Sequence, residues 1–297
     1  MDWLEITVVA AAADEEAVSD VLRAYAGGVA IEGGEGAPGG RGGRLLSLKA
    51  YLPRDARLPS RRRALRRALS RIEMSQPLAI APSRTVREED WANAWKKHFR
   101  VERVGRLVIR PRWRRYAAKD GESVITLDPG MAFGTGQHPT TRMCLLALQE
   151  RLPAKVRILD LGAGSGILAI AAVLLGAAEV IALDTDPLAV DIAKENVAAN
   201  GVEAKVNVGE GSLGAAWPFD GAWQRRFDCV VANISSATII ELSGDLVGAL
   251  RSGGLGIAGG ISEERVDDCW RALEEVGARV IDVMAEGEWR TLLFEVT

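Results

Sequence analysis

The sequence has few of the residues that form disulfides or bind transition metals. Its 297 residues include only three cysteines and two histidines. The cysteines are widely spaced, lie among apolar residues and are odd in number, so they cannot all pair. Structural zinc and similar ions are usually held by clusters of cysteine and histidine side chains. We therefore expect buried free thiols in a reducing compartment and no metal site.

Long apolar runs are also missing. No stretch of about eighteen consecutive apolar residues occurs, so the sequence predicts no membrane-spanning helix. The first residues, MDWLE, place no basic segment before an apolar one, unlike a signal peptide. With 48% hydrophobic and 26% charged residues, the composition is typical of a globular protein. We expect a cytoplasmic protein that is long enough for two domains.

Charge is unevenly distributed along the chain. Residues 1–86 carry thirteen basic and ten acidic side chains, whereas residues 87–297 carry twenty-four basic and thirty acidic ones. Eight of the arginines fall within residues 54–71, where Leu65 and Leu69 keep helical spacing. This pattern predicts an amphipathic helix with arginines on its outer face. Two interpretations stay open: a solvated surface, or a weak contact with RNA phosphates or an acidic surface.

The chain divides into two regions with different patterns. Residues 1–86 alternate short strand and helix signals in the order βαββαβ, which favours a small ferredoxin-like α+β domain. Within them, residues 33–43 contain seven glycines and predict a mobile hairpin loop. Residues 87–105 are typical of a connector. From residue 106 to 297, strand and helix signals alternate, which indicates an α/β sheet flanked by helices.

The strongest motif is VRILDLGAGSG at residues 156–166. An apolar run of this kind is typical of a buried parallel strand, and it ends in a turn with Gly162, Gly164 and Gly166. Glycines let a ligand approach the backbone, and the helix that follows offers free N–H groups. A dinucleotide fingerprint has its third glycine five positions after the first, where this chain has Ile167. The closer spacing here favours S-adenosyl-L-methionine over a nicotinamide cofactor.

Acidic residues follow the next two strand signals. Asp184 lies twenty-two residues after Gly162, at a strand's carboxyl end, where a carboxylate can bind both ribose hydroxyls. Asp186 precedes Pro187, a pair that is typical of a helix start, so we assign Asp186 to capping. Glu210 follows the third strand. Two roles stay open for Glu210, a contact with the adenine edge and an ordinary loop acid.

Asn233 ends the fourth strand signal and is our candidate catalytic residue. Methyl transfer is an in-line displacement, and the attacking amine must arrive neutral with its lone pair aimed at the methyl group. An asparagine side-chain oxygen can accept a hydrogen from that amine and orient it. The alternative is that Asn233 caps a helix beginning near Ala237. We favour the catalytic role because of its position at a strand's carboxyl end.

A loop rich in glycine, proline and threonine, LDPGMAFGTGQHPTT at residues 127–141, precedes a helix from Arg142. It is close enough to the glycine turn in sequence to fold over a bound cofactor. His138 could act as a general base or cap the helix, and we favour capping. Thr141 is the better candidate for a cofactor contact, and Phe133 joins the candidate cofactor-binding residues.

Four segments carry a resemblance to a known family. Residues 127–141, 158–170 (ILDLGAGSGILAI), 182–187 (ALDTDP) and 230–234 (VVANI) match the PrmA methyltransferases in order and spacing. The resemblance implies a Rossmann-like, seven-stranded class I methyltransferase domain behind a ferredoxin-like substrate-recognition domain. It also implies that the lysine ε-amines, and in some cases the α-amine, of ribosomal large-subunit protein L11 at the stalk base are methylated.

The family's cofactor contacts would fall on Thr141, Gly162, Asp184 and Asn233. For the substrate, lysines of another protein or a small amine are the alternatives. A nicotinamide-dependent oxidoreductase and a non-catalytic RNA-binding protein are alternatives from other classes. We expect the protein to be a monomer.

Overall fold

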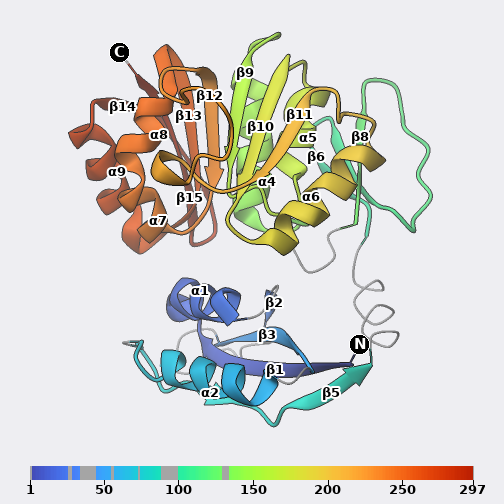
Figure 1. Cartoon of the computed structure of the whole chain (residues 1–297), viewed down its shortest axis with the longest axis vertical. Coiled ribbons are helices and arrows are strands. Elements are labelled where there is room, and N and C mark those ends of the chain that lie inside the picture. The colour runs from blue at the N-terminus through green and yellow to red at the C-terminus, as the bar shows by residue number, and fades with distance from the viewer. Residues whose placement is uncertain are drawn as a thin grey trace. The chain divides into compact units, whose positions relative to one another are not determined.

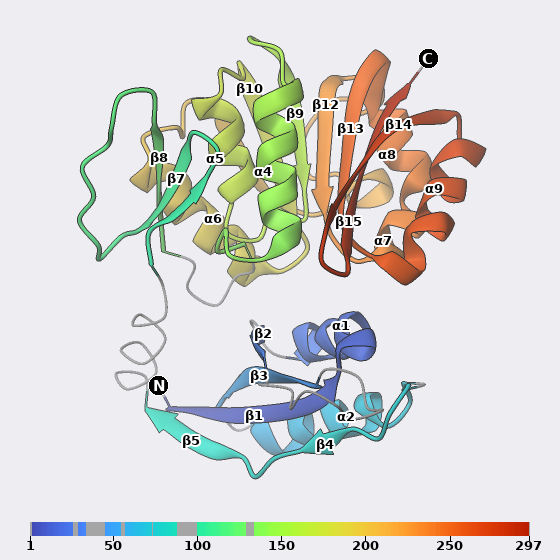
Figure 2. The ribbon, with the colours of Figure 1, turned by 180° about the vertical axis from the view of Figure 1, so that it is seen from behind.

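The computed structural model describes residues 2–25, 29–33, 45–54, 57–72, 74–87, 100–128 and 134–296. The chain forms two compact units, Met1–Phe99 and Arg100–Thr297 (Figures 1 and 2). The glycine-rich loop beyond Gly33 and residues 88–99 of the predicted connector lie outside the described residues. The domain boundaries at residues 86 and 105 therefore stay a prediction.

The first unit holds an antiparallel sheet and two longer helices. Its elements are β1 (Asp2–Ala11), α1 (Glu15–Tyr25), β2 (Val29–Gly33), β3 (Leu45–Pro53), α2 (Leu58–Leu69), β4 (Ala79–Ile80) and β5 (Arg84–Arg87). The strand order is β2-β3-β1-β4, and β5 pairs with β1 as well. The elements follow in the predicted order βαββαβ, and β5 is an additional strand that the sequence analysis did not predict.

Helix α2 has the predicted amphipathic character. Leu65 and Leu69 are buried and join a core with alternate residues of the strands, such as Val8 and Leu48. The arginines on the outer face include Arg63, Arg66 and Arg67, which are exposed. Burying the two leucines against the sheet orients the helix, so the arginines face solvent.

The second unit is built on a seven-stranded sheet in the order β11-β10-β9-β12-β13-β15-β14. The first five of these run parallel, and β15 is antiparallel to both β13 and β14. The bounds are β9 (Arg157–Leu161), β10 (Glu179–Asp184), β11 (Val206–Glu210), β12 (Phe227–Asn233), β13 (Leu250–Ser262), β14 (Ala278–Glu286) and β15 (Trp289–Val296). This sheet, with helices on both faces, is the predicted Rossmann-like α/β fold.

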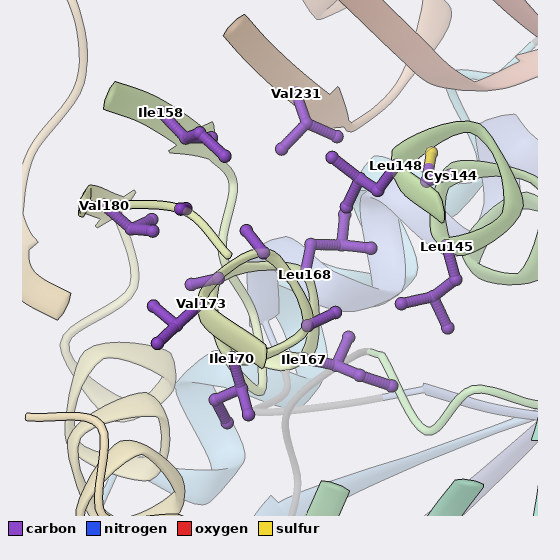
Figure 3. Close-up of a cluster of buried hydrophobic side chains, with 14 of the residues drawn as sticks. Cys144, Leu145, Leu148, Ile158, Ile167, Leu168, Ile170, Val173, Val180 and Val231 are labelled. Atoms are coloured by element: carbon purple, nitrogen blue, oxygen red, sulfur yellow. The ribbon is translucent and has the colours of Figure 1, made fainter. Parts of the chain in front are cut away.

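Two apolar cores cover the two faces of this sheet. Successive residues of β9 point to opposite sides, so Ile158 joins one core and Leu159 the other. Figure 3 shows the first core, where Leu145 of one helix and Leu168 of another pack beneath the strands. Burial on both faces explains why the strands are continuous apolar runs in the sequence. The helices are α4 (Pro139–Arg151), α5 (Ile167–Leu174), α6 (Pro187–Ala199), α7 (Ser236–Glu241), α8 (Ser243–Ala249) and α9 (Val266–Glu275).

A second, three-stranded sheet precedes α4 in the chain. Its strands are β6 (Glu102–Val104), β7 (Leu107–Pro111) and β8 (Ser123–Leu127), in the order β6-β7-β8. Gln149 of α4 holds this sheet, because its amide donates to the carbonyl of Val104 at 3.1 Å and accepts from the N–H of Arg106 at 2.8 Å. In the part of the chain that the structure describes, no helix is long and apolar enough to cross a membrane.

Candidate functional site

The candidate site lies at one edge of the seven-stranded sheet. Strands β9, β10, β11 and β12 are parallel, so their carboxyl ends meet at the same edge. The strand order reverses between β9 and β12, and ligands of open α/β sheets bind at such a switch point. Gly162, Asp184, Glu210 and Asn233 end or follow these four strands. The fold therefore brings together four of the residues that the sequence singled out.

The glycine turn adopts a backbone that other residues rarely take. Gly162, Gly164 and Gly166 have φ angles of +74°, +53° and +79°. A Cβ at Gly162 would lie 2.2 Å from the side chain of Ile234, and one at Gly166 would lie 3.3 Å from the Cβ of Ala193. Backbone conformation and internal packing thus require glycine at both positions. The close approach of a ligand, which the sequence suggested, stays a prediction.

Asp184 is tied to the glycine turn by its carboxylate. Oδ2 accepts from the N–H of Gly164 at 2.8 Å, and Oδ1 accepts from the N–H of Asp186 at 3.0 Å. Burial raises the pKa of Asp184, while these backbone hydrogen bonds act in the opposite direction. A carboxylate has about four acceptor positions, so this one can still accept from a ribose hydroxyl. Its neighbour in register on β11 is Glu210, which is exposed.

The predicted helix caps are confirmed in two cases. The Asp186 carboxylate accepts from the N–H of Leu188 at 2.9 Å and begins α6. His138 is the N-cap of α4, because its ring nitrogen accepts from the N–H of Thr140. The His138 ring also meets Trp289 edge-on, with centroids 4.9 Å apart. Helix α4 begins at Pro139, three residues earlier than the sequence analysis expected.

Asn233 is the last residue of β12, and its side chain has two different environments. Nδ2 donates to the hydroxyl of Thr141 at 3.3 Å. Oδ1 is buried and has no hydrogen-bond partner among the described residues. Helix α7 begins at Ser236, and Ser235 caps it by accepting from the N–H of Thr238. The alternative role of Asn233 as a helix cap is therefore wrong, and its role toward a ligand stays a prediction.

Thr141 lies in the first turn of α4 and is fully buried, with 0% exposure. Its hydroxyl accepts from Asn233. This contact orients the asparagine amide, so that Nδ2 is occupied and Oδ1 is not. A direct contact between Thr141 and the cofactor stays a prediction. Phe133 lies outside the described residues.

Several residues that hold the site together were missed by the sequence analysis. The Ser165 hydroxyl donates to the carbonyl of Gly134 at 2.6 Å and so ties the loop before α4 to the glycine turn. Asn196 of α6 donates to the carbonyls of Ser165 at 2.9 Å and Asp128 at 3.1 Å, and it accepts from the N–H of Asp128 at 2.9 Å. Asn200, four residues later, pairs with the backbone of Thr126 in the same way. An asparagine repeated at helical spacing was the signal available in the sequence.

Asp160 is a further residue that the sequence analysis did not single out. It lies in the middle of the buried strand β9 and is 0% exposed. Oδ2 accepts from the N–H of Ala169 at 3.0 Å, whereas Oδ1 has no hydrogen-bond partner among the described residues. Burial raises the pKa of Asp160 to about 7. An acidic residue inside an apolar run was the visible signal, because such a group is rarely buried without a role.

The arrangement fits an adenosylmethionine site. Asp184 offers acceptors for a ribose, the first residues of α5 offer backbone N–H groups, and Asn233 offers an amide oxygen. The N–H groups of the turn itself, from Gly162, Gly164 and Gly166, already donate within the protein. Among the residues that the structure describes, no group of three or more His, Cys, Asp and Glu side chains is placed to hold a metal ion.

Comparison with known proteins agrees with this geometry. The sequence profile described as Ribosomal protein L11 methyltransferase (PrmA) matches residues 2–297. The ribosomal protein L11 methyltransferase of Chloroflexus aurantiacus is 42% identical, over 98% of this chain and 97% of that protein. Its counterpart from Pelotomaculum thermopropionicum is 40% identical, over 98% of both chains. The crystal structure of a ribosomal protein L11 methylase from Lactobacillus delbrueckii subsp. bulgaricus is 33% identical, with a TM-score of 0.61 over 67% of this chain and 99% of that one.

These matches extend over nearly the whole chain, and they decide between the reactions that a glycine turn and a following carboxylate could support. Methyl transfer from S-adenosylmethionine is assigned, and the nicotinamide-dependent oxidoreductase is set aside. The chain belongs to the ribosomal protein L11 methyltransferase (PrmA) family and is an S-adenosylmethionine-dependent protein methyltransferase.

Proposed function

We propose that this enzyme methylates lysine ε-amino groups of ribosomal protein L11, with the N-terminal α-amine as a further acceptor. The observation that carries the proposal is the buried Oδ1 of Asn233, which has no partner among the described residues. It lies at the carboxyl end of β12, beside the glycine turn, where an amine could meet a cofactor. The names of the relatives supply the protein substrate.

In this proposal the residues hold and orient, and no side chain acts as a base. Bound S-adenosylmethionine supplies an electrophilic methyl group. Asp184 accepts from the ribose and the N–H groups that begin α5 face the ligand. Asn233 accepts a hydrogen from the neutral amine and directs its lone pair. His138 is already engaged as the cap of α4, so it is a poor candidate for proton transfer.

The test of the substrate is the intact mass of L11 after incubation with the enzyme and S-adenosylmethionine. We expect mass increases in steps of one methyl group, located on lysines or the N-terminus by peptide mapping. Asn233→Ala should slow these increases strongly. Asn207→Ala, at an exposed asparagine on β11, is the matched control and should have little effect. If L11 stays unmodified while another protein or a small amine is methylated, the proposal for L11 is wrong and that other molecule is the substrate.

The cofactor contacts are tested separately by calorimetry. Asp184→Ala removes a charge-assisted hydrogen bond, worth about 1.5–3 kcal/mol, and should weaken S-adenosylmethionine binding about tenfold or more. Asp191→Ala, an exposed aspartate on α6, is the control and should bind normally. Equal affinity of the two variants would remove Asp184 from the site. Glu210→Ala in the same assay distinguishes an adenine contact from an ordinary loop acid.

The first unit serves substrate recognition in this proposal, and α2 is its candidate contact with RNA or an acidic surface. Reversing the charges of Arg62, Arg63, Arg66 and Arg67 should weaken substrate use and flatten its salt dependence if α2 makes such a contact. An unchanged rate would identify α2 as a solvated surface. The proposal also includes that the enzyme is a monomer and acts in the cytoplasm. Analytical sedimentation of the full chain tests its oligomeric state.

A further inference from the structure

A strongly basic segment lies on the three-stranded sheet of the second unit. Residues 100–122 carry eight basic and three acidic side chains, whereas residues 123–297 carry thirteen basic and twenty-four acidic ones. The basic residues gather on β6, β7 and the connection from β7 to β8. In Figures 1 and 2 this green connection projects away from the seven-stranded sheet. The segment is therefore a positive surface on an otherwise acidic unit.

The connection begins with Arg112-Trp113-Arg114-Arg115-Tyr116, which alternates guanidinium groups with aromatic rings. Arg112 and Arg115 are exposed, and neither makes an ion pair or side-chain hydrogen bond with the described residues. Because no acidic side chain pairs with these two arginines among the described residues, their charges contribute no ion pair to the isolated protein. They are available to an anionic partner.

Arg115 and Tyr116 of this connection line a groove, and Arg112 lies outside its lining. The groove has a volume of about 670 Å³ and is lined by Arg110, Arg115, Tyr116, Ala117, Val124 and Thr126. Arg110 is held in place beside the groove, because it donates to the hydroxyl of Thr126 at 2.6 Å and to the carbonyl of Arg114 at 2.7 Å. Arg115 is unconstrained at the same groove. One fixed and one adaptable guanidinium suit a chain of phosphates better than a single ion.

Tyr116 adds a ring whose orientation is fixed. Its hydroxyl donates to Glu122 at 2.6 Å and accepts from Arg103 at 2.9 Å, while Arg103 also pairs with Glu122 at 2.7 Å. The phenol hydroxyl thus has two partners, and Tyr116 is one of the residues that line the groove. Single-stranded nucleic acids bind where a basic groove follows the phosphates and an aromatic ring stacks on a base.

We propose that the groove between Arg110, Arg115 and Tyr116 binds single-stranded RNA. A groove that joins guanidinium groups to an aromatic ring favours RNA over an acidic protein, which offers carboxylates and no bases to stack. The site belongs to the second unit alone and does not involve Asn233 or Asp184. It is independent of the methyl-acceptor proposal, so either can fail without the other.

The experiment is fluorescence anisotropy with a labelled oligouridylate of twelve nucleotides and the full chain. We expect a dissociation constant in the range of about 1–100 µM that rises steeply with salt. The double variant Arg112→Glu with Arg115→Glu should weaken binding at least about tenfold. It should also make the salt dependence weaker: the slope of the logarithm of the dissociation constant against the logarithm of salt concentration should fall by about 1.4, the value for two lost phosphate contacts. The control, Lys194→Glu with Lys205→Glu, reverses two exposed lysines of the same unit and should bind within about twofold of the parent.

Two variants of one residue isolate the stacking contact. Tyr116→Phe and Tyr116→Leu both lose the hydrogen bonds to Glu122 and Arg103, but only the phenylalanine keeps a ring. We expect Tyr116→Phe to bind as the parent does and Tyr116→Leu to bind about fivefold or more weakly. Equal binding by the two variants would overturn the stacking role. Two results would overturn the proposal as a whole. One is that polyglutamate displaces the labelled oligouridylate as well as unlabelled RNA does. The other is that the arginine reversals leave binding of the oligouridylate unchanged.

Discussion

At the scale of single residues, the role of each side chain in the site depends on whether its polar atoms already have hydrogen-bond partners within the protein. Asn233 and His138 show the difference most clearly. The His138 ring nitrogen is used by the cap of α4, whereas Oδ1 of Asn233 is buried without a partner among the described residues. A buried acceptor without a donor costs free energy, so a ligand that donates a hydrogen gains from meeting it.

The first prediction compares these two residues. Asn233→Ala should reduce the single-turnover rate of methyl transfer by at least about tenfold, the effect of losing one positioned hydrogen bond of about 1.4 kcal/mol or more. Cofactor affinity should change much less. His138→Ala should reduce the rate only modestly, through a weaker helix start. A larger loss for His138→Ala than for Asn233→Ala would contradict the role of Asn233.

The second prediction concerns the contribution of Asp160, whose pKa burial raises to about 7, to the pH dependence of stability. An unfolded aspartate has a pKa near 3.9, so between these values the folded state binds the extra proton. The contribution of Asp160 to the free energy of unfolding is therefore largest below pH 4, and it is lost as the pH rises toward 7 and beyond. Between pH 6 and pH 8 the loss should be about 1.4 kcal/mol.

Asp160→Asn is the variant that checks this result, because its amide copies the shape of the protonated acid without titrating. Urea unfolding of the ligand-free chain at pH 6 and pH 8, followed by tryptophan fluorescence, gives the two free energies. We expect the parent chain to lose more stability than Asp160→Asn over this interval. An identical pH dependence in both proteins would show that Asp160 does not carry this proton.

At the scale of elements, helix α6 joins parts of the site that are distant in sequence. Asn196 connects it to the end of β8 and to the glycine turn, and Asn200 connects it to β8 itself. Both asparagines bind backbone atoms on two or more segments. The positions of Thr126 and Asp128, where β8 ends, therefore depend on α6 as well as on the sheet.

The third prediction follows from the burial of Asn196, which is 2% exposed. Asn196→Ala removes three hydrogen bonds and should lower the free energy of unfolding by about 2–4 kcal/mol. It should also weaken S-adenosylmethionine binding, because the carbonyl of Ser165 in the turn loses its partner. Asn207→Ala on β11 is the exposed control and should stay within about 0.5 kcal/mol of the parent. A small effect in both variants would mean that β8 and the turn hold their positions without α6.

At the scale of the whole molecule, the chain consists of two units with separate cores. Every described candidate residue for cofactor binding or catalysis lies in the second unit. The first unit contributes the arginine-rich helix α2 and a separate antiparallel sheet. In our proposal this unit binds the protein substrate and so raises its local concentration.

The fourth prediction tests that division. A fragment that starts at Val86 should fold and bind S-adenosylmethionine with the affinity of the full chain. Its kcat/KM for the protein substrate should fall, since the grip on that substrate is lost. Calorimetry and steady-state methylation of L11 measure the two properties. Full protein methylation by the fragment would assign the first unit another role.

The sequence by itself determined the βαββαβ order of the first unit apart from β5, the alternation of strands and helices in the second unit, and the position of the glycine turn. Local signals were sufficient there, because apolar runs, turn glycines and helix caps such as Asp186 depend on neighbouring residues. Only the tertiary structure decided which atoms of the candidate residues are engaged. Thr141 meets Asn233 ninety-two positions away, and Asn196 meets Asp128 across sixty-eight. Such contacts depend on how strands and helices pack, and no local pattern records them.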